Sequence, residues 1–142
     1  MPSLQLSIQK LSATGIPVRA TLKRWVLAAL ERDAALTLRF VGTREGRRLN
    51  REFRRKDYAT DILTFPYSTQ PTVIADIVVC LPAVQREARL RGRPPREHLA
   101  HLIVHATLHA HGYHHGSIRD ARAMEKREAQ VMKALGKPDP YG

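Results

Sequence analysis

The alternation of apolar and polar residues divides the chain into short strands and helices. Runs that are apolar at every second position, or rich in β-branched residues, predict strands at 4–8, 36–41, 60–65 and 76–81. Apolar residues spaced three or four apart predict helices at 17–31, 44–55, 82–90 and 96–112, and a last helix that starts at Ser117. Leu49 and Phe53 are expected to face inward, and Trp25 to pack in the core. We therefore predict one α+β domain over residues 1–142, with about four strands in a mixed sheet and four to five helices.

The net charge of the chain gives the first indication of a binding partner. Lys and Arg total 24 against 13 Asp and Glu, a formal net charge of +11. Such an excess indicates a polyanionic partner, either nucleic acid or an anionic membrane surface. We favour nucleic acid because the arginines fall in separate blocks rather than along one amphipathic helix. The alternative is a basic surface that only keeps the protein soluble.

Three further features favour a cytoplasmic protein that does not enter a membrane. No apolar run approaches the roughly 20 residues that a membrane helix needs. The first residues, MPSLQLSIQK, lack the order of charges and apolar residues typical of a secretory signal. Cys80 is the single cysteine, which fits a reducing compartment.

All 7 histidines fall between positions 98 and 115. At roughly 100° per residue, His105 and His109 lie on one face of the predicted helix and can bind a single ion. The rest of the helix circumference is almost entirely apolar, so the helix is expected to be buried. Unpaired imidazoles are costly in such surroundings, and a metal ion would satisfy them.

Gly112 is expected to end this helix in a left-handed conformation, so that the chain doubles back and delivers His115. The resulting H-x3-H-x5-H spacing is that of the extended metzincin zinc motif. Three protein ligands leave a fourth position open, as in catalytic zinc sites. We therefore predict one zinc ion on His105, His109 and His115, although Ni²⁺, Co²⁺ and Cu²⁺ also suit imidazole. The alternative is a solvated, histidine-rich tract.

The other histidines have less specific interpretations. His101 extends the ridge of His105, and we expect it to be packed rather than to support a ligand. His111 projects to the opposite side and is expected on the surface. His114 is adjacent to His115 and is its rival as third ligand.

Ala106 stands where zinc proteases with this motif carry the glutamate that serves as general base. Peptidase chemistry of that type therefore lacks its proton acceptor. Hydrolysis would have to use a zinc-bound water, whose pKa falls to about 7, or another group.

Residues His105 to His115 read HATLHAHGYHH and resemble the H-G-x-L-H-L-x-G-Y-D-H signature of the YbeY family of rRNA-maturation endoribonucleases. Residues 49–66 read LNREFRRKDYATDILTFP and are similar to the family's L-N-x-x-Y-R-x-x-D-x-P-T-D-V-L-S-F-P. Residues 76–78 resemble its G-D-I segment, and 124–125 the start of its last helix. The resemblance covers most of the chain from Leu49 onward.

This resemblance implies a bacterial, cytoplasmic, zinc-dependent endoribonuclease that cuts single-stranded RNA. Family members act in 16S rRNA 3′-end maturation and ribosome quality control, which implies rRNA and the small ribosomal subunit as partners. The motif histidines carry over onto His105, His109 and His115 as metal ligands. The family's arginine carries over onto Arg54 as a catalytic or RNA-binding residue.

Four positions depart from the family pattern. Ala106 and Ala75 replace glycines, and Ala110 replaces a larger apolar residue. His114 replaces an aspartate, which removes a carboxylate from beside the third ligand and adds a competing imidazole. Metal affinity or metal identity is therefore expected to differ here.

Arg54 has the chemistry to grip a phosphate bidentately and to stabilise charge that develops during RNA hydrolysis. The alternative role for Arg54 is a structural ion pair with Asp57 or Asp61. Further basic residues would attract the RNA backbone, or would form a solvated helix face; they are Arg44, Arg47, Arg48, Arg51, Arg55 and Lys56.

Two other function classes stay open. A non-catalytic ribosome-assembly factor with a structural metal would explain the charge but leave the open coordination position without a purpose. A metallopeptidase fits the histidine spacing, but it lacks the glutamate and does not need the basic surface.

Overall fold

The computed structural model describes residues 1–11, 14–54 and 60–142, apart from the side chain of Arg54. Within these residues four strands and five helices follow in the order β1 (Leu4–Lys10), α1 (Arg19–Ala29), β2 (Ala34–Val41), α2 (Thr43–Arg54), β3 (Ile62–Ser68), β4 (Val73–Cys80), α3 (Leu81–Leu90), α4 (Pro95–Ala110) and α5 (Ile118–Ala134). The predicted α+β class and element order are confirmed. No helix in the described ranges combines the length and the apolar character that crossing a membrane requires.

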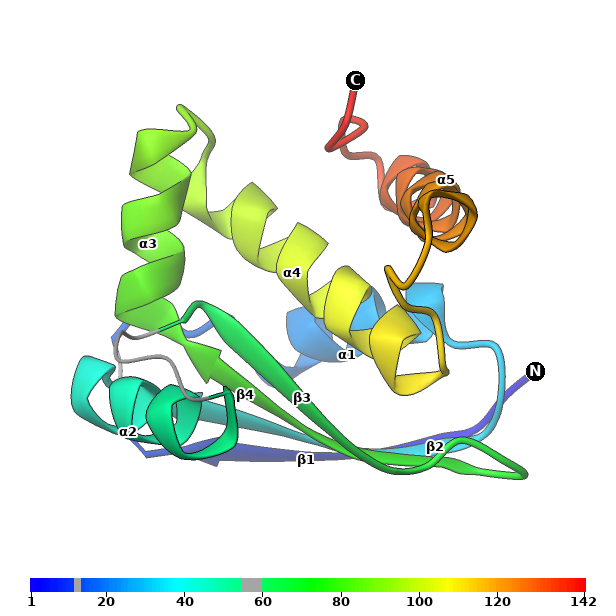
Figure 1. Ribbon diagram of the computed structural model, residues 1–142, viewed down its shortest axis with the longest axis horizontal. Helices are drawn as coiled ribbons and strands as arrows, with labels where there is room; N and C mark the ends of the chain where they lie inside the picture. The colour runs from blue at the N-terminus through cyan, green and yellow to red at the C-terminus, as the bar shows by residue number, and fades with distance from the viewer. Residues whose placement is uncertain (12–13, 55–59) are drawn as a thin grey trace.

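The four strands form one mixed sheet in the order β1-β2-β4-β3. β1 pairs with β2 and β2 with β4 in parallel, whereas β3 runs antiparallel to β4. β3 is therefore an edge strand. Figure 1 shows α1, α4 and α5 on the same side of the sheet, with α4 lying across it.

Successive residues of β4 point to opposite faces of the sheet, and each face has its own apolar cluster. Four alternate residues belong to the larger core beneath α1, α4 and α5; they are Val73, Ala75, Ile77 and Val79. Val78 and Cys80 belong instead to a smaller cluster that includes Leu49 of α2. Trp25, as predicted, is fully buried in the larger core.

Helix α4 packs against α1, α3, α5, β3 and β4, as its nearly continuous apolar surface predicted. Pro95 stands at its start, where the missing N–H costs no hydrogen bond. At the other end Gly112 adopts a φ of +112°. The backbone N–H of Tyr113 then donates to the carbonyl of Leu108 at 3.2 Å, so the chain reverses as expected.

Two local predictions were wrong. β3 does not end at Phe65 but continues through Pro66 to Ser68, which an edge strand tolerates because the missing N–H need not pair. Phe53 is 61% exposed rather than inward-facing. Its ring packs edge-on against Phe65 at 5.1 Å between centroids, because the last turn of α2 lies over the edge strand and not over the core.

His111 is the third correction, because it is buried rather than on the surface. Its Nδ1 donates to the carbonyl of Thr107 at 2.8 Å. Its Nε2 accepts hydrogen bonds from the backbone N–H groups of Glu31 at 3.1 Å and Arg32 at 3.3 Å. These two groups follow the end of α1, so His111 ties α4 to the α1–β2 connection.

We predict that His111→Ala lowers the free energy of unfolding by about 1–3 kcal/mol, since two backbone donors lose their acceptor. Urea unfolding of the chelator-treated protein measures this effect. His114→Ala, on an exposed side chain, should change stability by no more than about 0.5 kcal/mol. Equal stability of the two variants would contradict the bridging role of His111.

Candidate metal centre

His105, His109 and His115 line one pocket of about 310 Å³. The first two project from α4, and His115 comes from the reversed chain after Gly112. Ring centroids lie 5.2 Å apart for His105 and His115, and 6.5 Å apart for His105 and His109. The opposite wall is the start of the edge strand, residues Ile62, Leu63 and Thr64. The fold thus brings the three predicted ligands together.

Hydrogen bonds behind the rings leave one nitrogen of His105 and of His109 for a metal. Nδ1 of His109 donates to the carbonyl of Tyr113 at 2.9 Å, and Nδ1 of His105 contacts the carboxylate of Glu128. Metal-binding histidines are typically fixed in this way, with the second nitrogen held by a carbonyl or carboxylate. On both residues Nε2 is then the nitrogen whose lone pair is left to coordinate a metal ion.

The electrostatics of the pocket favour a neutral imidazole at His109. Burial lowers the pKa of His109, opposed by its hydrogen bond to Tyr113 and reinforced by the neighbouring His105 and His115. A neutral imidazole is the form that binds a metal. The donor set therefore suits zinc. Among the described residues, no group of three or more His, Cys, Asp or Glu side chains has the arrangement that holds a metal ion. The rings of His105 and His109 are nearly parallel, at 3°.

Glu128 of α5 is a site residue that the sequence reasoning missed. It has no exposed surface, and it contacts His105, His101 and Tyr141. Burial opposes its ionisation, but these three partners outweigh burial and lower its pKa to about 2. Its signal in the sequence was an acid on the apolar face of α5, between the buried Met124 and Val131.

The two histidines next to the predicted ligands lie elsewhere. The ring of His114 is 59% exposed and lies 3.5 Å from the carboxylate of Asp120. It does not line the histidine pocket, whereas His115 does. His101 is buried, as expected, with its Nε2 3.5 Å from Glu128. The geometry therefore favours His115 over His114 as the third ligand.

Arg54 ends α2, but its side chain lies outside the described residues, as do Arg55, Lys56 and Asp57. The predicted role of Arg54 stays a prediction. Arg48 pairs with Glu45 at 3.4 Å and Glu52 at 3.3 Å on its own helix. For Arg48 the helix-face interpretation therefore gains support.

The chain matches the family model described as Endoribonuclease YbeY over residues 9–136. A protein from Methylibium petroleiphilum named Endoribonuclease YbeY is 51% identical over 143 residues, covering 99% of this chain and 95% of that protein. One of the same name from Delftia acidovorans is 48% identical, covering 97% and 95%. The solution structure of TM1509 from Thermotoga maritima shares the fold, with a TM-score of 0.61, 24% identity and coverage of 96% and 97%.

We predict that His115→Ala abolishes zinc binding while His114→Ala retains it, because only His115 lies in the pocket with His105 and His109. Elemental analysis of protein purified without a histidine tag, followed by titration of the metal-free form with zinc, provides the measurement. His105→Ala and His109→Ala are expected to behave like His115→Ala. The opposite result for His114 and His115 would show that the assigned register of this turn is wrong.

Proposed function

Because the chain belongs to the endoribonuclease YbeY family, we propose that it is a zinc-dependent endoribonuclease that cleaves single-stranded RNA. The observation that carries this proposal is the pocket where three imidazoles meet the edge strand β3. We further propose that it acts in the cytoplasm on the small ribosomal subunit. Its roles there would be 16S rRNA 3′-end maturation and ribosome quality control.

The charge of the chain supports a polyanionic substrate. A formal net charge of +11 attracts the phosphate backbone without selecting a base sequence. The position of α2 supports the same substrate, because this arginine-rich helix ends at Arg54, shortly before β3 enters the pocket at Ile62. RNA drawn to this side of the molecule would lie beside the three histidines.

Each residue of the pocket has a separate task in the proposed reaction. His105, His109 and His115 would hold zinc, which when bound brings the pKa of a coordinated water to about 7. Glu128 and the carbonyl of Tyr113 orient two of these rings. Thr64 lines the opposite wall, and its hydroxyl would bind a substrate oxygen. Arg54 would stabilise the extra negative charge on the phosphate.

The lining of the pocket argues against a peptidase. Ala106, in the position of the peptidase glutamate, is fully buried in the core. None of the described residues that line the pocket is an acid. Glu128 lies behind His105, where it orients a ring and does not face a substrate.

The same lining argues against a purely structural metal. Structural zinc sites usually have four protein ligands. Here only three of the described lining residues, the histidines, have side chains that suit zinc. A hydrolase needs an open coordination position on its metal, whereas a non-catalytic assembly factor does not need one.

We predict that the purified protein cleaves single-stranded RNA, that a chelator abolishes cleavage and that added zinc restores it. Denaturing gels of end-labelled single-stranded and duplex RNA of one sequence measure the activity. His109→Ala is the control for a contaminating nuclease. RNA cleavage that persists in this variant would contradict the proposal, and so would hydrolysis of peptides instead of RNA.

Arg54→Ala should reduce cleavage by about a hundredfold or more, the usual cost of losing one preorganised charge stabiliser, with little change in melting temperature. Arg91→Ala removes the arginine that directly follows α3 and pairs with Glu87 at 2.8 Å, and this variant serves as the matched control. Full cleavage per folded molecule, accompanied by a large loss of stability, would identify Arg54 as a structural ion-pair residue instead.

A further inference from the structure

We propose that Tyr141, near the end of the chain, is a positioning residue for the metal centre. Its hydroxyl holds the carboxylate of Glu128, and Glu128 in turn orients the ring of His105. This inference rests on the proposed function, in which His105 binds zinc. It makes the C-terminal tail, residues 135–142, part of a site whose ligands lie on α4 and the following loop.

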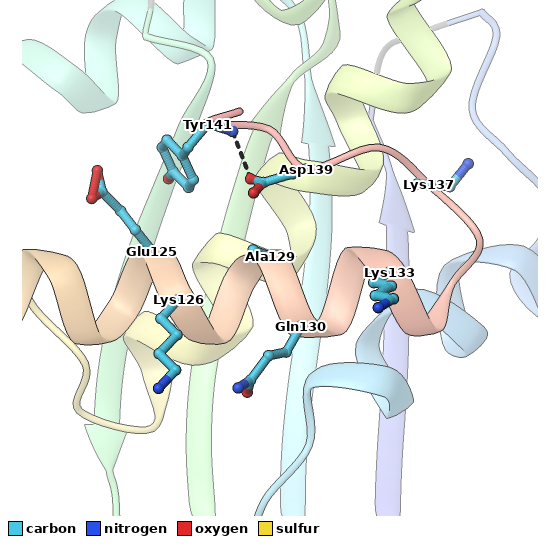
Figure 2. A pocket seen from close by; sticks show the side chains of 8 residues that line it. All are labelled: Glu125, Lys126, Ala129, Gln130, Lys133, Lys137, Asp139 and Tyr141. Atoms are coloured by element: carbon cyan, nitrogen blue, oxygen red, sulfur yellow. Dashed lines mark hydrogen bonds between the residues drawn. The ribbon is translucent and has the colours of Figure 1, made fainter.

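The tail is folded back by a specific turn at the end of α5. Gly136 adopts a φ of +73°, and the N–H of Lys137 donates to the carbonyl of Met132 at 2.9 Å. This arrangement ends the helix and reverses the chain. Figure 2 shows the tail returning along α5 above Ala129, with the N–H of Tyr141 donating to Asp139 at 2.8 Å. Tyr141 is thereby returned to the middle of α5.

The ring and the hydroxyl of Tyr141 have different surroundings. The residue is 48% exposed, and its ring stands edge-on to His101 at 5.5 Å between centroids. The hydroxyl, in contrast, donates to a carboxylate with no exposed surface. Burial and the contact with Glu128 raise the pKa of Tyr141, so it stays a protonated donor. A half-exposed tyrosine that reaches a buried charge is better suited to orienting that charge than to filling the core.

The two carboxylate oxygens of Glu128 contact different residues. Oε1 contacts Nδ1 of His105, while Oε2 accepts from the Tyr141 hydroxyl. Nε2 of His101 lies 3.5 Å from Oε2, longer than a normal hydrogen bond. Tyr141 is therefore the close donor to Oε2 among the described residues. Without the Tyr141 hydroxyl, Oε2 of Glu128 loses its hydrogen-bond donor while it stays buried. The carboxylate can then form a shorter hydrogen bond with His101 by moving towards it and away from His105.

This arrangement predicts a graded effect on metal affinity. Loss of a group that touches a metal ligand typically weakens binding by about 10–100-fold. Glu128→Gln is expected in that range. Tyr141→Phe removes a contact one step further from the metal, so we expect zinc binding weaker by about 3–10-fold, below that range.

The experiment measures the zinc affinity of the metal-free protein, residues 1–142, by competition with a chromophoric chelator. Tyr141→Phe keeps the ring against His101 and removes only the hydroxyl. Tyr67→Phe is the matched control, because the Tyr67 hydroxyl also donates to a carboxylate, that of Asp76 at 2.9 Å. The melting temperature of each metal-free variant reports folding separately from metal binding.

A double variant tests whether Tyr141 acts through Glu128. If it does, Glu128→Gln/Tyr141→Phe should bind zinc no more weakly than Glu128→Gln alone, because the carboxylate through which Tyr141 acts is already absent. Additive losses of affinity would overturn this route. A purely structural tail would lower the melting temperature of Tyr141→Phe and leave its zinc affinity at the wild-type value.

The outcomes separate this inference from the proposed function. Weaker zinc binding by Tyr141→Phe, with Tyr67→Phe unchanged, supports the inference even if the wild type cleaves no RNA. Equal affinity of Tyr141→Phe and wild type overturns the inference and leaves the proposed nuclease intact. A wild type that takes up no zinc overturns both.

Discussion

A carboxylate without exposed surface lies between α4 and α5, and the arrangement of the candidate site depends on keeping it charged and paired. An ionised group is stable in such a position only with close hydrogen-bond donors. Glu128 obtains them from His105 on α4 and from Tyr141 in the tail, while His101 lies further away, at 3.5 Å. One buried charge therefore joins α4, α5 and the tail, and it fixes the ring that would bind the metal.

The site also depends on the position of α4 within the fold. An apolar surface around most of its circumference buries the helix, and the pocket that His105 and His109 line lies beside the edge strand. Gly112 then reverses the chain and returns His115 to the same side. Because β3 is antiparallel and has no further neighbour in the described sheet, Thr64 and its neighbours form an accessible wall.

The acid of this site serves a different purpose from the acid of the protease motif. In the protease motif a glutamate follows the first histidine and acts on the substrate. Here Ala106 occupies that position, and Glu128, which belongs to another helix, contacts Nδ1 of His105. The histidine spacing is therefore compatible with metal-assisted hydrolysis, while proton transfer by a neighbouring glutamate is not available. A strongly basic chain makes RNA the better match than peptide.

Local patterns in the sequence determined the strands and helices, the buried course of α4, the glycine turn and the grouping of His105, His109 and His115. These features follow from spacing within one helix and one turn. Tertiary structure decided the burial of His111 and the roles of Glu128 and Tyr141, because their partners lie on other elements of the chain. Periodicity describes which face a residue occupies, but not which distant donor or acceptor packs against that face. Phe53 shows the same limit, since its four-residue spacing from Leu49 was correct while the core beneath it ended one turn earlier.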